Sequence, residues 1–144
     1  MKEPSFVVID YGLGNLRSVK NALAFPGCEV RISDQPRDVE RATALILPGV
    51  GAFGEAMQNL GKRQLVRPIR TAVLDNGIPL LGICLGVQRI AERGEERGTH
   101  EGLGLIPGHF VHTCCLETEE RFVAARCNYG VLRPFHSPAL SPFS

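Results

Sequence analysis

The stretch that decides the fold is Pro79-Leu80-Leu81-Gly82-Ile83-Cys84-Leu85-Gly86-Val87-Gln88. Its apolar run predicts a buried strand that ends at Cys84, and a helical pattern begins directly afterwards. The G-x-C-x-G form is the cysteine version of the nucleophile elbow, a sharp turn that presents a reactive side chain. Gly82 and Gly86 fit this turn because it leaves no room for Cβ atoms. We predict a nucleophilic Cys84, with its thiolate favoured by the following helix; a buried structural cysteine is the alternative.

The chain before this stretch alternates between short apolar runs and helical patterns. Strands are predicted at residues 6–10, 28–32 and 44–47, and helices at residues 16–24, 33–41, 54–59 and 64–75. Asn15 is a suitable N-cap for the first helix, and Pro68 is expected to kink or restart the last one. This order predicts an α/β fold with an open, mostly parallel sheet and helices on both faces.

A glycine-rich segment, Pro48–Phe53, follows the third predicted strand. Ligands of parallel α/β sheets bind beyond the carboxyl ends of the strands. A loop of this kind can turn backbone N–H groups toward a developing negative charge, although a plain connection between strand and helix is the alternative. The glycines of Gly12-Leu13-Gly14 make no dinucleotide fingerprint, because Arg17 stands where the third glycine is required.

Beyond the elbow, the helical pattern runs from Leu85 to Glu92, and residues 93–102 are polar and glycine-rich. We therefore expect a helix followed by an exposed loop, in which His100 is solvated. The closing residues, 137–144, are rich in Pro and Ser and show no strand or helix pattern.

Composition narrows the function classes. A chain of 144 residues fits one domain, and a net charge of +1 gives no argument for nucleic-acid binding. No apolar run approaches the roughly 20 residues of a membrane span. Five cysteines without framework spacing, and no signal-peptide pattern, favour a reducing cytoplasm. No Cys/His cluster has the spacing of a structural zinc site, so we predict no metal and no cofactor.

Four motifs stand in order over residues 6–108. They are I-D-Y-G-L-G-N-L at 9–16, L-P-G-V-G-A-F at 47–53, G-I-C-L-G-V-Q at 82–88 and G-L-G-L-I-P-G at 102–108. Together they resemble the class I (triad) glutamine amidotransferases, which have a flavodoxin-like sheet. Within that family the resemblance is to the glutaminase subunit of imidazole glycerol phosphate synthase, an enzyme of histidine biosynthesis.

The resemblance implies a nucleophile and an oxyanion site. Cys84 matches the residue that attacks the side-chain amide of glutamine, forms a glutamyl thioester and releases ammonia. Gly49, Val50 and Gly51 match the oxyanion strand, and the N–H group of Leu85 is the second donor to the tetrahedral intermediate.

Substrate contacts and a partner are also implied. Gln88 matches a residue that contacts bound glutamine, the alternative being a solvent-facing helix residue. Glu96 falls where the family places a carboxylate near the amino group of the substrate, the alternative being an ordinary loop charge. The family passes ammonia to a (β/α)8 barrel cyclase subunit, so a heterodimer is expected.

The histidine and glutamate of the family triad have no full match. In the nearest string, Pro134-Phe135-His136-Ser137-Pro138, His136 would be the general base and Pro138 stands where the orienting glutamate belongs. We favour a second alignment, in which residues 109–130 match an earlier family segment and the chain ends before the pair. His112 is then the other candidate base, although an ordinary strand histidine fits its surroundings better.

Two function classes remain on this basis. One is a glutaminase subunit with weak or no turnover, and the other is a non-catalytic binding or docking module that retains the fold. We expect one amidotransferase-like domain over residues 1–130, with reduced C-terminal strands, and an irregular tail over residues 131–144. A redox sensor built on Cys84 fits less well, because no resolving cysteine is near it in the sequence.

Overall fold

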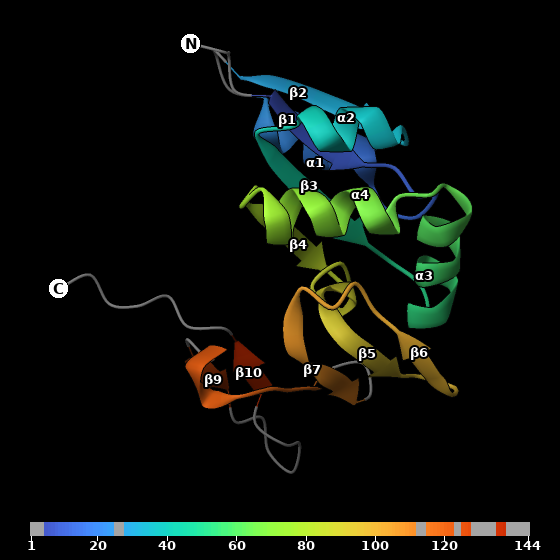
Figure 1. Ribbon diagram of the computed structural model, residues 1–144, viewed down its shortest axis with the longest axis vertical. Helices are drawn as coiled ribbons and strands as arrows, with labels where there is room; N and C mark the ends of the chain where they lie inside the picture. The colour runs from blue at the N-terminus through green and yellow to red at the C-terminus, as the bar shows by residue number, and fades with distance from the viewer. Residues whose placement is uncertain (1–4, 25–27, 112–114, 123–124, 128–134, 138–144) are drawn as a thin grey trace, which may run out of the picture.

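The computed structural model describes residues 5–24, 28–111, 115–122, 125–127 and 135–137. A parallel sheet with its helices occupies one end of the molecule, and a second sheet of shorter strands lies at the other end (Figure 1). The chain passes from the first part to the second directly after Cys84.

The first sheet has four parallel strands in the order β2-β1-β3-β4. They are β1 (Ser5–Ile9), β2 (Glu29–Ser33), β3 (Ala44–Gly49) and β4 (Leu80–Cys84). In β3 every residue after the first is buried, as expected of a strand covered on both faces. The register pairs Gly49 with Cys84, so the glycine-rich loop and the elbow leave the sheet side by side.

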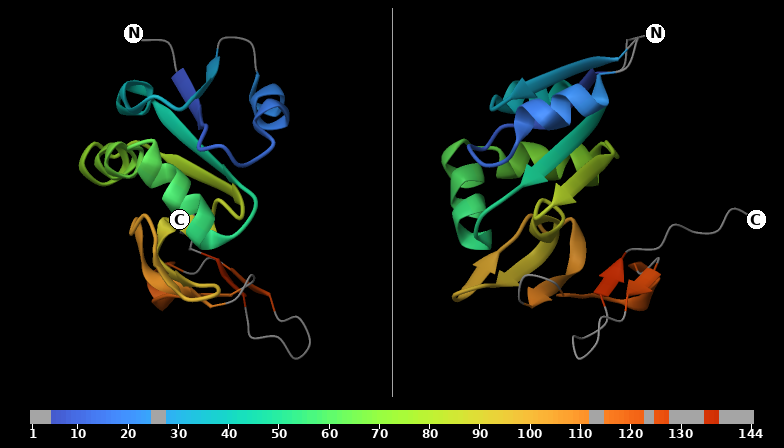
Figure 2. Two further views of the ribbon diagram at one scale, coloured as in Figure 1. Left: turned by 90° about the vertical axis from the view of Figure 1, so that its right-hand side faces the viewer. Right: turned by 180° about the vertical axis from the view of Figure 1, so that it is seen from behind.

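Helices cover both faces of this sheet, so the predicted fold class is confirmed. They are α1 (Leu16–Leu23), α2 (Pro36–Arg41), α3 (Phe53–Lys62) and α4 (Val66–Arg70), the last continued by the π-helical turn η1 (Thr71–Asp75). Figure 2 shows α1 on one face and α2 and α4 on the other. Asn15 caps α1 as predicted, because its side chain accepts a hydrogen bond from the Ser18 N–H at 3.3 Å.

The main core lies between the sheet and the helices α2, α3 and α4. Val7 and Leu45 point into it from β1 and β3, and Leu60 and Ile69 meet them from α3 and α4. Val8 is equally buried and points to the opposite face, where α1 packs, since successive side chains of a strand alternate.

The second sheet has the order β6-β5-β7-β8, with β5 and β7 parallel and the outer pairs antiparallel. Its strands are β5 (Ala91–Glu95), β6 (Thr99–Glu101), β7 (Ile106–Val111) and β8 (Cys115–Glu117). The predicted helix after the elbow and the predicted loop at 93–102 are therefore wrong. Only a short 3-10 turn, η2 (Gln88–Ile90), follows Cys84 before β5 begins.

Hydrogen bonds from residues 102–105 explain the difference. The backbone N–H groups of Gly102, Leu103, Gly104 and Leu105 donate to the carbonyl oxygens of residues 89–92, at 2.7 to 2.9 Å. In a helix that continued past residue 92, those same carbonyl oxygens would accept from the N–H groups of residues 93–96, so the turn after Cys84 cannot be extended as an α-helix. The segment that carries the G-L-G-L motif thus ends the helical turn and turns the chain into a strand.

Three short elements complete the described part of the chain: η4 (Glu120–Phe122), β9 (Ala125–Cys127) and β10 (Phe135–Ser137). The strands β9 and β10 pair with each other as an antiparallel ribbon. The rest of the predicted tail at 131–144 lies outside the described residues. In the described ranges, no helix is long and apolar enough to cross a membrane.

Candidate active site

Cys84 stands on a strained turn. Its φ angle is +55°, in the left-handed region, and its side chain is exposed. This conformation costs a residue with a Cβ atom roughly 1–2 kcal/mol, and such strain gathers at functional sites. The alternative of a buried structural cysteine therefore does not describe Cys84.

Backbone contacts around Cys84 explain the glycines of the motif. A Cβ atom on Gly86 would lie 1.9 Å from the carbonyl oxygen of Leu47, and one on Gly49 would lie 2.2 Å from the nitrogen of Gly86. A Cβ atom on Gly82 would meet the Val87 backbone at 2.9 Å. Gly82 and Gly86 therefore leave no room for a Cβ atom, as the motif predicts, and the end of β3 touches the elbow main chain to main chain.

The turn after Cys84 is held by tight hydrogen bonds. The Gly86 N–H donates to Ile83 at 3.0 Å, and the Val87 N–H donates to Cys84 at 3.1 Å. These bonds span three residues rather than four, so the turn is not α-helical. The predicted stabilisation of the thiolate by an α-helix terminus is therefore not supported by the fold.

The glycine-rich loop lies next to this turn. Gly49 pairs with Cys84, Val50 is exposed, and Gly51 has a φ of +75°. Among the described turns and loops, no backbone hydrogen bond is donated by the N–H groups of Val50 or Gly51.

A buried arginine holds the other side of this loop. Arg89 is 0% exposed, and its Nη2 donates to the carbonyl oxygens of Gly51 at 2.9 Å, Ala52 at 3.3 Å and Val50 at 3.4 Å. Its Nη1 donates to the carbonyl oxygen of Leu85 in the elbow. Arg89 is not among the site residues predicted from the sequence. The one feature that could have drawn attention to it is its positive charge, four positions after Leu85.

Electrostatics at Arg89 are set mainly by burial. Loss of hydration lowers the pKa of Arg89, and the neighbouring Tyr11, Glu96 and Cys84 partly offset this shift. Burial raises the pKa of Tyr11, and the nearby Arg89 charge opposes this shift. The Tyr11 hydroxyl donates to the carbonyl oxygen of Pro48 at 2.5 Å, just before the loop.

The two predicted substrate contacts lie in different settings. Gln88 is only 6% exposed, so it is not a solvent-facing helix residue. Glu96 accepts a hydrogen bond at 2.7 Å from the N–H of Phe53, the first residue of α3. In this structure the Glu96 carboxylate therefore ties the loop after β5 to the helix that follows the glycine-rich loop.

His100 is not solvated as predicted. Its Nε2 lies within hydrogen-bond distance, 3.1 Å, of the carbonyl oxygen of Glu96, and its ring packs near Phe53 with centroids 6.5 Å apart. A Cβ atom on Gly54 would meet the His100 ring at 2.6 Å. His100 thus contributes to the contact between the second sheet and the start of α3.

The candidate bases are described only in part. His112 lies outside the described residues, and for His136 the backbone alone is described. His136 pairs with Arg126 in the ribbon of β9 and β10, which lies beside the second sheet and below β4 in both views of Figure 2. Among the described residues, no group of three or more His, Cys, Asp or Glu could hold a metal ion.

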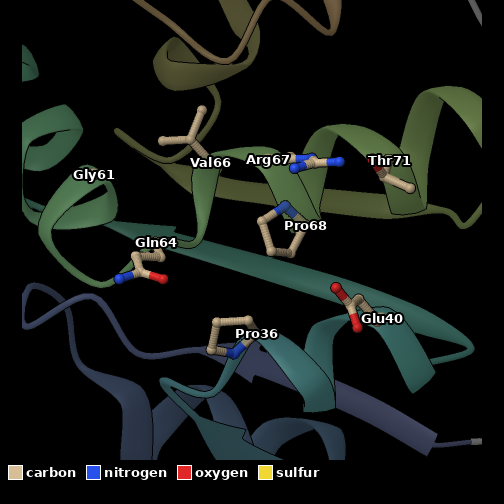
Figure 3. A pocket seen from close by; sticks show the side chains of 8 residues that line it. All are labelled: Pro36, Glu40, Gly61, Gln64, Val66, Arg67, Pro68 and Thr71. Carbon is tan, nitrogen blue, oxygen red and sulfur yellow. The ribbon is translucent and has the colours of Figure 1, made fainter.

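One sizeable cleft lies away from the elbow. It has a volume of about 640 Å³ and opens between α2 and α4 (Figure 3). Its lining consists of Pro36, Glu40, Gly61, Gln64, Val66, Arg67, Pro68 and Thr71. Neither a thiol nor a histidine lines it, so the chemistry of the elbow, rather than cleft size, locates the candidate site.

Comparison with known proteins identifies relatives of this chain. Curated relatives include the Imidazole glycerol phosphate synthase subunit HisH of Salinibacter ruber, 46% identical over 105 residues, covering 73% of this chain and 48% of that protein. The same subunit of Symbiobacterium thermophilum is 52% identical over 102 residues, covering 71% and 48%. That of Geobacillus kaustophilus is 44% identical over 133 residues, covering 92% and 62%. The chain spans about half the length of most of these relatives.

A solved structure shares the fold. It is titled "Crystal structure of glutamine amidotransferase", with a TM-score of 0.60 and 24% identity, and the match covers 72% of this chain and 54% of that one. The family described as Glutamine amidotransferase class-I matches residues 7–120, which include the elbow, the glycine-rich loop and Arg89. This chain therefore belongs to the class-I glutamine amidotransferase family.

Proposed function

We propose that this chain is the glutaminase subunit of imidazole glycerol phosphate synthase and acts in the cytoplasm. The observation that carries the proposal is the exposed Cys84 on its left-handed turn, paired with Gly49. Relatives that bear the name of this subunit share 44–52% of their residues with the chain over the matched regions. The partner is a (β/α)8 barrel cyclase subunit, which receives the ammonia.

The proposed reaction begins with the Cys84 thiolate. Its sulfur bonds to the side-chain carbonyl carbon of glutamine, and the carbonyl oxygen becomes an oxyanion that accepts hydrogen bonds from the N–H groups of Val50, Gly51 and Leu85. The carbon–nitrogen bond then breaks, and the nitrogen takes up the proton from the thiol and leaves as ammonia. Water attacks the remaining thioester, releasing glutamate and restoring Cys84.

Three further residues complete the proposed site. Gln88 and Glu96 bind the glutamine, and Glu96 would then exchange its hydrogen bond with Phe53 for one with the substrate's amino group. In the alignment that places His136 at the triad histidine, His136 is the candidate base that moves the thiol proton to the leaving nitrogen. Because Pro138 stands where an orienting carboxylate is required, we expect slow turnover.

Thiol labelling tests the proposal independently of turnover. A chloroketone analogue of glutamine should alkylate Cys84 faster than Cys28, a half-buried thiol outside the site, and excess glutamine should protect Cys84. Equal labelling of the two thiols would reject the proposed site. Cys28→Ala is the matched control, and Cys84→Ala should abolish the fast labelling.

A turnover assay separates the two function classes. Glutamate release is measured with glutamine and a barrel cyclase subunit, with Cys84→Ala as the negative control. Slow, Cys84-dependent release supports the glutaminase. Binding to the cyclase with no release at all would instead support the non-catalytic docking module.

A further inference from the structure

We propose that Arg89 is a positioning residue that fixes the glycine-rich loop against the elbow and so presents the oxyanion donors. Its guanidinium contacts carbonyl oxygens on both segments, Val50, Gly51 and Ala52 on one side and Leu85 on the other. The consequence for catalysis rests on the proposed function, whereas the consequence for loop geometry does not.

The planarity of the peptide bond connects these contacts with the donors. In a trans peptide the carbonyl oxygen and the following N–H point in opposite directions. Holding the Val50 carbonyl toward the buried Arg89 therefore turns the N–H of Gly51 away from the interior. Cys84 is itself exposed and pairs with Gly49 at the start of this loop, so we infer that a donor that faces outward here lies near the thiol.

The position of Arg89 is costly for stability. A fully buried cation loses its hydration, and here it is satisfied mainly by neutral carbonyl oxygens and by the Phe53 ring, whose centroid is 5.9 Å from the guanidinium carbon. Its Nε has no hydrogen-bond partner among the described residues. Removing the side chain would leave these carbonyl oxygens without a donor and would itself cost stability, so the positioning role has to be measured by readouts other than stability.

The first test measures loop order. We compare the wild type with Arg89→Leu, Arg89→Lys and the control Arg70→Leu, which removes a guanidinium that donates to the Leu103 carbonyl. The ¹⁵N order parameter of the Gly51 amide should fall from about 0.85 to below about 0.6 in Arg89→Leu, because the carbonyl oxygens of residues 50–52 then lose their donor. Arg89→Lys should be intermediate, and Arg70→Leu should equal the wild type. Unchanged order in both Arg89 variants would overturn the proposal.

The second test measures oxyanion stabilisation. A chloroketone analogue of glutamine passes through an oxyanion when it alkylates the thiol, whereas iodoacetamide does not. Arg89→Leu should slow chloroketone labelling of Cys84 about 10–100-fold, somewhat less than the loss of a whole oxyanion donor. Iodoacetamide labelling should change less than about 2-fold, and Arg89→Lys should recover part of the chloroketone rate. Equal slowing by both reagents would indicate a merely structural role and would overturn the proposal.

Failure of the proposed glutaminase function can be distinguished from failure of the proposed role of Arg89. In that case the ratio of chloroketone to iodoacetamide labelling rates would be the same for Cys84 and Cys28 in the wild type. The order parameter of the Gly51 amide would still fall in Arg89→Leu. If Arg89→Leu fails to fold, Arg89→Lys retains the charge and loses the planar fork of donors, so it still tests the geometry.

Discussion

At the scale of single residues, two buried polar side chains determine the path of the chain beside Cys84. Tyr11 donates to the carbonyl oxygen of Pro48, and Arg89 donates to the next carbonyls along the loop. Neither role follows from the motifs, since I-D-Y-G-L-G-N-L predicts only a tight turn and a helix cap. The partners lie 37 to 39 positions away in the sequence, so folding alone brings them together.

We predict that Tyr11→Phe lowers the free energy of unfolding by about 1–3 kcal/mol at neutral pH, because the buried Pro48 carbonyl loses its donor. The pKa of Tyr11 is raised in the folded protein, so its contribution is complete below the unfolded value of about 10 and is lost as the pH rises through the folded value. The wild type should therefore lose stability more steeply than the variant above about pH 10. Urea unfolding from pH 8 to 11 measures this, and equal slopes would contradict it.

At the scale of elements, the first sheet is predictable because each strand is a short apolar run bounded by Gly, Pro or polar residues. The second sheet is not predictable in this way. In β5, Ala91 and Gly94 are buried, and the charged Glu92, Arg93 and Glu95 are exposed. Such a strand forms because distant segments pair with it and because the Phe53 ring requires a glycine at position 94. Neither the pairing of β5 with β7 nor the packing of Phe53 against Gly94 can be predicted from the local sequence pattern.

The residues of the candidate site also fall into two groups: those predictable from local sequence and those that depend on packing between distant segments. Cys84, the glycine-rich loop and the glycines of the elbow are predictable, because their requirement is local: a strained turn and close backbone contact. The burial of Gln88 and the contact between Glu96 and Phe53 depend on where the second sheet packs. Arg89 is missed for the same reason.

Two glycines test the contact between β3 and the elbow. Gly49→Ala should lower the free energy of unfolding by at least about 3 kcal/mol, since its Cβ atom would lie 2.2 Å from the Gly86 nitrogen and neither backbone can move freely. Gly61→Ala is the matched control: it lies in α3, and its Cβ atom would meet nothing within 4 Å. The control should raise the free energy by up to about 1 kcal/mol. Urea titration measures both, and equal effects would contradict the contact.

At the scale of the whole molecule, the last strand of the first sheet carries exposed apolar surface. Within the described chain β4 pairs only with β3, and Leu81 on it is 54% exposed. Leu81 pairs with the buried Ile46, on the face of the sheet where α1 lies. An uncovered strand with an apolar side chain favours association between molecules.

We predict that Leu81→Thr reduces concentration-dependent association of the 144-residue chain, measured by sedimentation velocity, and changes the free energy of unfolding by less than about 0.5 kcal/mol. Leu80→Thr is the comparison, because Leu80 points to the opposite face and packs against the main core. It should lower the free energy of unfolding by about 1–3 kcal/mol without reducing association. If association is unchanged in Leu81→Thr, a part of the surface other than Leu81 mediates the association.

The loop beside Cys84 is held through its carbonyl oxygens, by residues that lie outside it, while the Val50 side chain is 46% exposed. Its shape is therefore largely independent of the side chain at position 50. A library randomised at Val50 can vary what an incoming molecule meets at the mouth of the site while the donors stay in place. Position 50 is thus open to engineering or natural drift in a way that its glycine neighbours are not.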